Sequence, residues 1–140
     1  MSAPAYFEDF RVGDRVRTPT RTITEADLAL FRALAGTPLA DGLYALALGG
    51  GLMVLAGDRG VPRSTIALWG LERVRFTSPA RAGDTVHLEA EVTQTTQVDH
   101  RRGLIAMSHR MMNQRGEDVA TYSSKLLVAR RPAAEGPTRG

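Results

Sequence analysis

The sequence predicts an α+β domain in which an antiparallel sheet wraps around one central, very apolar helix. Residues 36–57 (GTPLADGLYALALGGGLMVLAG) are the most apolar run of the chain, and apolar positions go nearly all the way round the helix they would form. A helix of that kind is buried on most sides. After Gly60, short segments alternate apolar and polar residues, as strands with one buried face do. A sheet that must bury one face beside such a helix favours this architecture.

The first element expected in order is a helix over TEADLALFRALAG, after a turn and an extended stretch in VGDRVRTPTRTI. Thr24 is the expected N-cap, and Asp27 makes a variant of the capping box. Gly36 ends this helix, and Pro38 prevents its continuation.

The apolar helix follows and opens at Asp41, whose plainest interpretation is an N-cap without chemistry. Three consecutive glycines, Gly49 to Gly51, stand in its middle. Each destabilises a helix by about 1 kcal/mol relative to alanine. We therefore expect another backbone or a ligand to come very close to this helix there.

The strands are predicted from alternation, with turn signals between them. One face of DTVHLEAEVT carries Val86, Leu88, Ala90 and Val92, and one face of LIAMSHRMMN carries Ile105, Met107, His109 and Met111. In LERVRFTSP, Val74 and Phe76 lie opposite Arg73 and Arg75. DVATYSSKLLV makes a last, mixed strand. A short helix, an apolar helix and then four or five antiparallel strands give the hot-dog arrangement.

Composition limits the function further. The 140 residues suggest one domain, expected over 7–130, with flexible ends at 1–6 and 131–140. The absence of cysteine excludes disulfides, thiolate metal sites and thiol catalysis. No secretion signal is evident, and the interrupted apolar run favours a core helix over a membrane span. A cytoplasmic protein is the default expectation.

Charge and motifs exclude other partners. A net charge of +3 without a dense basic stripe is a weak signal for nucleic acid. The densest points, Arg101-Arg102 and Arg130-Arg131, are interpreted as solvated strand ends, with a phosphate-bearing ligand as the alternative. No metal-ligand spacing, P-loop or dinucleotide motif occurs. We expect no metal and no cofactor.

Four segments together resemble the MaoC-like (R)-specific enoyl-thioester hydratase/dehydratase family. They are YFEDFRVGD, TITEADLALFRALAG, FTSPARAGDTVHLEAEV and NQRGEDVATYSSKLLV, in the family's order over about residues 6–129. The resemblance implies a hot-dog domain, usually dimeric, that adds or removes water in acyl thioesters of coenzyme A or acyl carrier protein. It also implies that N–H groups at the start of the central helix hold the thioester carbonyl, as a helix N-terminus is suited to do.

The chain departs from the family where the water-activating Asp and His are expected. LAGTP passes directly into LADGL, so roughly seventeen residues of the loop that carries this pair are missing by comparison. Thr37 stands near the family's Asp, and Asp41 stands where the family often has the His before the helix glycine, here Gly42. The pair cannot be transferred to residues of this chain.

Three residues are candidates for catalysis in its place. Asp41 is a cap or a general base beside a thioester. Tyr44 lies one turn later on the same helix face and either orients a carbonyl or water or packs in the core. His109, between Met107 and Met111, is a core or interface histidine unless it faces the ligand tunnel, where it could serve as the base.

Three further residues are candidates for substrate binding: Thr37, which could position a water, Gly42 at the helix start, and Trp69, which could line the acyl pocket or be ordinary core. The main hypothesis is an acyl-thioester hydratase/dehydratase with altered catalytic residues. A thioesterase that uses Asp41 is an alternative, as is a non-catalytic hot-dog subunit or a pocket repurposed for cyclisation or isomerisation. The expected partners are the acyl thioester and a second copy of the chain, or another hot-dog subunit.

Overall fold

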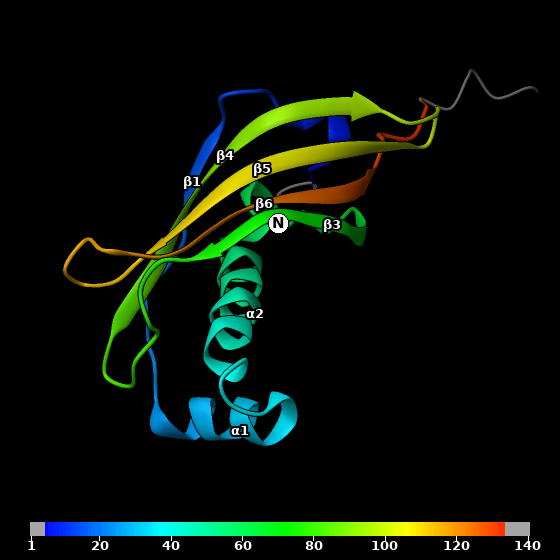
Figure 1. Cartoon of the computed structure of the whole chain (residues 1–140). Helices are drawn as coiled ribbons and strands as arrows, with labels where there is room; N and C mark the ends of the chain where they lie inside the picture. The colour runs from blue at the N-terminus through cyan, green and yellow to red at the C-terminus, as the bar shows by residue number, and fades with distance from the viewer. Residues whose placement is uncertain (1–4, 134–140) are drawn as a thin grey trace, which may run out of the picture.

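The computed structural model describes residues 5–133, and Figure 1 shows their arrangement. Residues 1–4 and 134–140, which contain most of the predicted flexible ends, lie outside the described residues. The elements in chain order are η1 (Phe7–Asp9), β1 (Arg15–Arg17), β2 (Arg21–Thr22), α1 (Glu25–Ala35), α2 (Ala40–Leu55), η2 (Gly57–Arg59), β3 (Thr65–Phe76), β4 (Thr85–Gln97), β5 (Arg102–Met112) and β6 (Asp118–Ala129).

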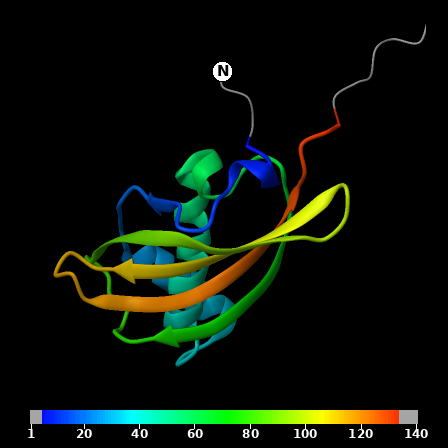
Figure 2. The same cartoon turned by 90° about the horizontal axis from the view of Figure 1, so that it is seen from above.

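The strands form one curved antiparallel sheet in the order β1-β4-β5-β6-β3, and β2 extends the pairing of β4. The long strands β4, β5, β6 and β3 make up most of it. They curve over α2, while α1 packs against α2 away from the sheet (Figure 1). Figure 2 shows the strands crossing α2. This is the predicted hot-dog arrangement, a single sheet wrapped around the apolar helix.

The core lies between α2 and the concave face of the sheet. The alternation predicted for β4 and β5 is confirmed, since the residues assigned to the inner faces are all buried: Val86, Leu88, Ala90, Val92, Ile105, Met107, His109 and Met111. The alternation predicted near the end of β3 is interrupted. Arg73 has a φ of 54°, and the pairing with β6 shifts register between Glu72 and Arg75, as at a β-bulge.

Helix α1 begins as predicted. The Thr24 hydroxyl accepts a hydrogen bond from the N–H of Asp27 at 3.1 Å, and Gly36, with a φ of 71°, ends the helix. The reciprocal half of the capping box is not formed, because the Asp27 carboxylate instead accepts hydrogen bonds from Arg21 and Tyr44. These two hydrogen bonds connect α1 to β2 and to α2.

The start of α2 differs from the prediction. The helix begins at Ala40, and its N-cap is Leu39, so the interpretation of Asp41 as the N-cap is wrong. The reason is that the chain already turns helically at Leu39 (φ −79°, ψ −27°), and the N–H of Ala40 bonds to the carbonyl of Gly36 at 2.9 Å. Only residues 36–39 connect the two helices.

Within residues 5–133, no single helix is long and apolar enough to cross a membrane. Helices α1 and α2 reach that length and hydrophobicity only together, as a pair bent by 115°.

Candidate functional site

A large apolar hollow lies along α2. This α2 cavity has a volume of about 490 Å³ and is bounded by α2, β3, β5 and β6, with Phe31 of α1 at one side. Aliphatic side chains and glycines form most of its wall: Leu43, Leu46, Ala47, Gly50, Met53, Gly60, Val61, Leu68, Leu71, Met107 and Leu126. A cavity of this size and apolarity suits a hydrocarbon group.

Three polar side chains interrupt this apolar wall. His109 of β5 and Tyr122 and Ser124 of β6 all line the cavity, and each is 6% exposed. His109 stands opposite Tyr122 in the register of the two strands, and their rings stack with centroids 4.6 Å apart. The Nε2 atom of His109 lies 2.7 Å from the Ser124 hydroxyl oxygen. The cavity therefore contains one compact polar cluster, which we call the β5–β6 cluster.

Burial determines the charge of this cluster. It lowers the pKa of His109 to about 4, because an imidazolium would lose its hydration there. It also raises the pKa of the Tyr122 hydroxyl to about 12. Near neutral pH the cluster is uncharged and offers hydrogen bonds rather than a charge to anything bound in the cavity.

The first turn of α2 borders a second hollow of about 250 Å³, the N-terminal pocket, whose wall includes Asp41, Gly42 and Phe76. The Phe76 ring lies 3.1 Å from the point where a Cβ on Gly42 would stand, so only glycine fits there without displacing the ring. The Asp41 carboxylate is paired with the guanidinium of Arg32 through contacts of 3.2 and 3.3 Å. Both side chains are about two-fifths exposed, so the pair is a surface pair.

Tyr44 is turned toward α1 rather than toward either hollow. Its hydroxyl donates a hydrogen bond to Asp27 at 3.1 Å, and its ring meets Phe31 edge-to-face at 5.5 Å. Desolvation, with the neighbouring carboxylate, raises the pKa of Tyr44 to about 12. Asp27 is held in turn by Arg21 at 2.8 Å, which lowers the pKa of its carboxyl group.

The remaining predicted residues are dispersed. Thr37 is exposed in the connection between the helices, where its bond to Pro38 is cis. Trp69 is exposed on β3 and borders neither the α2 cavity nor the N-terminal pocket. Of the candidates, the structure brings Asp41 and Gly42 together and places His109 in the cavity.

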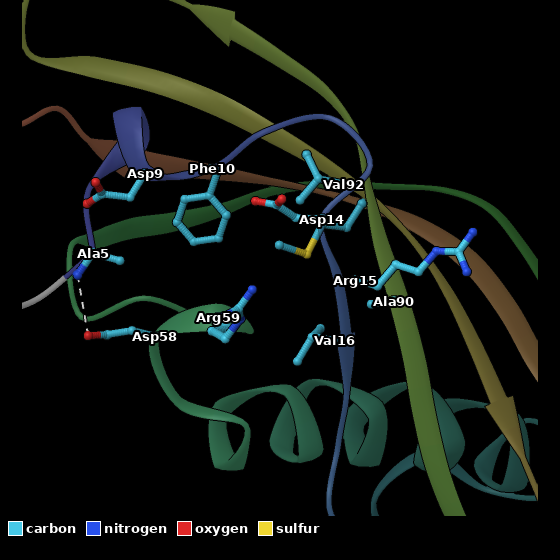
Figure 3. Close-up of a pocket in the computed structure, with 11 residues that line it drawn as sticks. Ala5, Asp9, Phe10, Asp14, Arg15, Val16, Asp58, Arg59, Ala90 and Val92 are labelled. Atoms are coloured by element: carbon cyan, nitrogen blue, oxygen red, sulfur yellow. Dashed lines mark hydrogen bonds between the residues drawn. The ribbon is translucent and has the colours of Figure 1, made fainter.

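A third hollow of about 240 Å³ lies beyond Met107, which also borders the α2 cavity. Its labelled side chains, among them Asp9, Asp14, Asp58 and Arg59, are drawn in Figure 3. The three carboxylates accept hydrogen bonds from main-chain N–H groups, as Asp58 does from Ala5. They stabilise the turns around them, which explains their presence without a ligand.

Among residues 5–133, no group of three or more His, Asp or Glu side chains could hold a metal ion. Three of the four arginines in the pairs noted in the sequence make ion pairs near strand ends. Arg102 contacts Asp99, while Arg130 and Arg131 contact Glu8 and Asp9.

Comparison with known proteins identifies the family. The model of the MaoC-like domain matches residues 33–113, more than half of the chain. The chain belongs to the MaoC-like dehydratase family. Protein MaoC of Klebsiella aerogenes is 33% identical over 69% of this chain, and the β-methylmalyl-CoA dehydratase of Chloroflexus aurantiacus is 32% identical over 94%. The aligned regions are 33% and 42% of the lengths of those two relatives.

Solved structures of this family share the fold. The MaoC-like dehydratase from Rhodospirillum rubrum superposes with a TM-score of 0.79 at 27% identity, over 92% of this chain and 99% of that one. The similarity therefore extends over nearly all of this MaoC-like chain.

Sequence reasoning missed two residues of the β5–β6 cluster. Tyr122 and Ser124 alternate with Leu126 along β6, and all three line the α2 cavity. The same period-two reading that placed His109 inward would have placed them inward as well. The signal was hidden because hydroxyl side chains on a strand resemble the solvent face.

Proposed function

We propose that this MaoC-like chain binds the acyl group of a thioester in the α2 cavity and catalyses reversible addition of water to its double bond. The observation that carries this proposal is the α2 cavity itself, an apolar hollow that runs along α2 from Leu43 to Met53 and suits an acyl chain. The dehydratases among its relatives support the reaction class.

The first turn of α2 is the proposed position of the thioester. Gly42 borders the N-terminal pocket and its neighbour Leu43 borders the α2 cavity, so this turn lies between the two hollows. The N–H of Ala40 bonds to the carbonyl of Gly36, which leaves the N–H groups of Asp41 and Gly42 in this turn, at the positive end of the helix dipole. They suit the oxygen of the enolate that forms when water adds to the double bond.

Asp41 is the proposed acid–base group. It is adjacent to Gly42, whereas the hydroxyl of Tyr44 is engaged by Asp27. Asp41 would take a proton from the attacking water and return it to the α-carbon, and Arg32 would hold the carboxylate in place. The short 36–39 connection is consistent with loss of the family's catalytic loop.

The test is an assay of crotonyl-CoA and longer enoyl-CoA that follows loss of the enoyl chromophore and release of free thiol together. We expect chromophore loss without thiol, and a decrease of about a hundredfold or more in Asp41→Asn, as for loss of an acid–base group. Glu25→Gln, which changes an acidic residue in the first turn of α1, is the matched control. Thiol release that depends on Asp41 would indicate a thioesterase instead, and no signal at high enzyme concentration would refute both activities for these substrates.

We also propose that two copies pair along β3. This strand is at the edge of the sheet, and both it and α2 carry exposed apolar side chains: Leu43, Val54, Leu55, Ile66, Leu68, Trp69 and Leu71. An apolar edge strand is a template for pairing with another chain. Leu43, Leu68 and Leu71 also line the α2 cavity, so a second copy there would close its open side.

Light scattering after size exclusion tests this pairing. We expect a dimer for the unaltered chain and a monomer for Leu68→Lys, which puts a charge into the proposed interface. Val12→Lys replaces an equally exposed apolar residue elsewhere and should remain dimeric. A monomeric unaltered chain would contradict the homodimer and favour a different hot-dog subunit as the partner.

A further inference from the structure

The β5–β6 cluster has hydrogen-bonding capacity that the protein does not use. Among the residues that the structure describes, none hydrogen-bonds to the Tyr122 hydroxyl, and Ser124 bonds through its side chain only to His109. The Tyr122 oxygen is not among the fully enclosed side-chain atoms that lack a partner, so it is open to the cavity, and polar groups inside proteins are nearly always paired with protein or water. A hydroxyl that lines an apolar cavity and lacks a protein partner therefore points to a partner in the ligand.

Hydrogen-bond accounting assigns the direction of the bonds. The Nδ1 atom of His109 is buried without a partner among residues 5–133. An orphaned buried N–H is rarer than an orphaned acceptor, so we assign the proton to Nε2, which donates to the Ser124 oxygen. The proton of the Ser124 hydroxyl is then free to be donated to another group. Ser124 and Tyr122 thus present two donors to the α2 cavity.

Gly49 makes room for one of these donors. The Tyr122 hydroxyl occupies the space that a Cβ atom on Gly49 would need. Glycine in the middle of a helix is less stable than alanine by about 1 kcal/mol. Glycine at this position therefore makes the helix less stable, but it leaves room for the Tyr122 hydroxyl between α2 and the sheet.

The cluster is far from the proposed position of the thioester. Gly49 follows Gly42 by seven residues, which corresponds to about 10 Å along the helix axis. A carbonyl at the first turn of α2 leaves the α- and β-carbons close to that turn. The cluster would then meet the acyl chain well beyond the carbons that react.

We propose that the Ser124 and Tyr122 hydroxyls form a recognition site for an oxygen atom in the middle of the acyl chain. The substrate class is an acyl thioester whose chain carries a hydroxyl or keto group at that distance from the carbonyl. This inference rests on the proposed binding of the acyl group in the α2 cavity. His109 acts as a positioning residue, since it holds the Ser124 oxygen at 2.7 Å.

The test compares the binding of saturated thioesters, which cannot undergo hydration or dehydration. Dissociation constants are measured by titration calorimetry for tetradecanoyl-CoA and for tetradecanoyl-CoA with one hydroxyl either in mid-chain at carbon 9, which an extended chain places at that distance from the carbonyl, or at the terminal carbon. We expect the mid-chain hydroxyl to strengthen binding by about tenfold over tetradecanoyl-CoA, because a site built with donors favours the ligand that satisfies them. The terminal hydroxyl should give no such gain.

Two variants and one control test the residues. Tyr122→Phe keeps the ring and removes one hydroxyl, and Ser124→Ala removes the other; each should reduce the mid-chain preference to about twofold or less. Ser123→Ala removes the hydroxyl next along β6, which does not line the cavity, and should keep the full preference. Circular dichroism checks that each variant is folded, and Tyr122→Phe alone decides if Ser124→Ala does not fold.

The outcomes separate this inference from the proposed function. If no tetradecanoyl thioester binds, acyl binding in the α2 cavity is refuted, and this inference with it. If all three ligands bind equally and Tyr122→Phe changes nothing, the oxygen site is refuted while acyl binding stands. A mid-chain preference that persists in both variants would place recognition elsewhere in the cavity and would also refute the proposal.

Discussion

The contact between Gly49 and Tyr122 can be tested by adding a single methyl group. In Gly49→Ala the new Cβ collides with the Tyr122 hydroxyl oxygen, while the next atoms, Cζ of Tyr122 at 3.4 Å and Cδ2 of Leu88 at 3.5 Å, stay at ordinary contact distance. The collision thus involves one atom. A Cβ on Gly51, two residues later in the same helix, meets nothing within 4 Å.

These contacts determine the magnitudes. Alanine in place of helical glycine stabilises by about 1 kcal/mol, which is the full expectation for Gly51→Ala. At Gly49 the same gain is opposed by overpacking of about 1–3 kcal/mol, because the Tyr122 side chain, which is stacked on His109, must shift away from α2. We expect Gly49→Ala to lower the free energy of unfolding by about 1 kcal/mol. In a Tyr122→Phe background it should raise it by up to about 1 kcal/mol.

The assay is denaturant unfolding followed by circular dichroism. All variants are compared at one protein concentration, because association changes apparent stability. The double-mutant cycle isolates the coupling between Gly49 and Tyr122, expected at about 1–3 kcal/mol. Equal effects of Gly49→Ala and Gly51→Ala, or the same Gly49→Ala effect in both backgrounds, would refute the reasoning.

Two further predictions concern stability. The pKa of His109 is about 4 in the folded chain, below its ordinary value of 6.5, so between these values the unfolded chain binds a proton that the folded chain does not. The free energy of unfolding should therefore fall as pH decreases from about 7 to 4, by up to about 3 kcal/mol. In His109→Gln, urea unfolding should no longer show this contribution to the pH dependence. Thr24→Ala removes the N-cap bond to Asp27 and should destabilise by about 1 kcal/mol, whereas an unchanged denaturation midpoint would show that the cap is dispensable.

The candidate site was only partly predictable from sequence. His109 could be placed on an inward face, because strand alternation has a period of two. Its bond to Ser124 could not, since it joins residues fifteen positions apart through the register of β5 and β6. Tyr44 is a second example: its position on the helix was predictable, but the hydrogen bond from its hydroxyl to Asp27 depends on how α1 packs against α2.

The sequence by itself determined the fold class, the apolar helix, the N-cap at Thr24 and the inner faces of β4 and β5. These features depend on local periodicity and on the chemistry of residues that are neighbours in the chain, and both can be read from the sequence alone. Tertiary structure decided why Gly49 is a glycine and which polar groups meet in the α2 cavity. Such contacts join residues that are distant in sequence, and the curvature of the sheet and the position of α2 against it are what bring them within bonding distance.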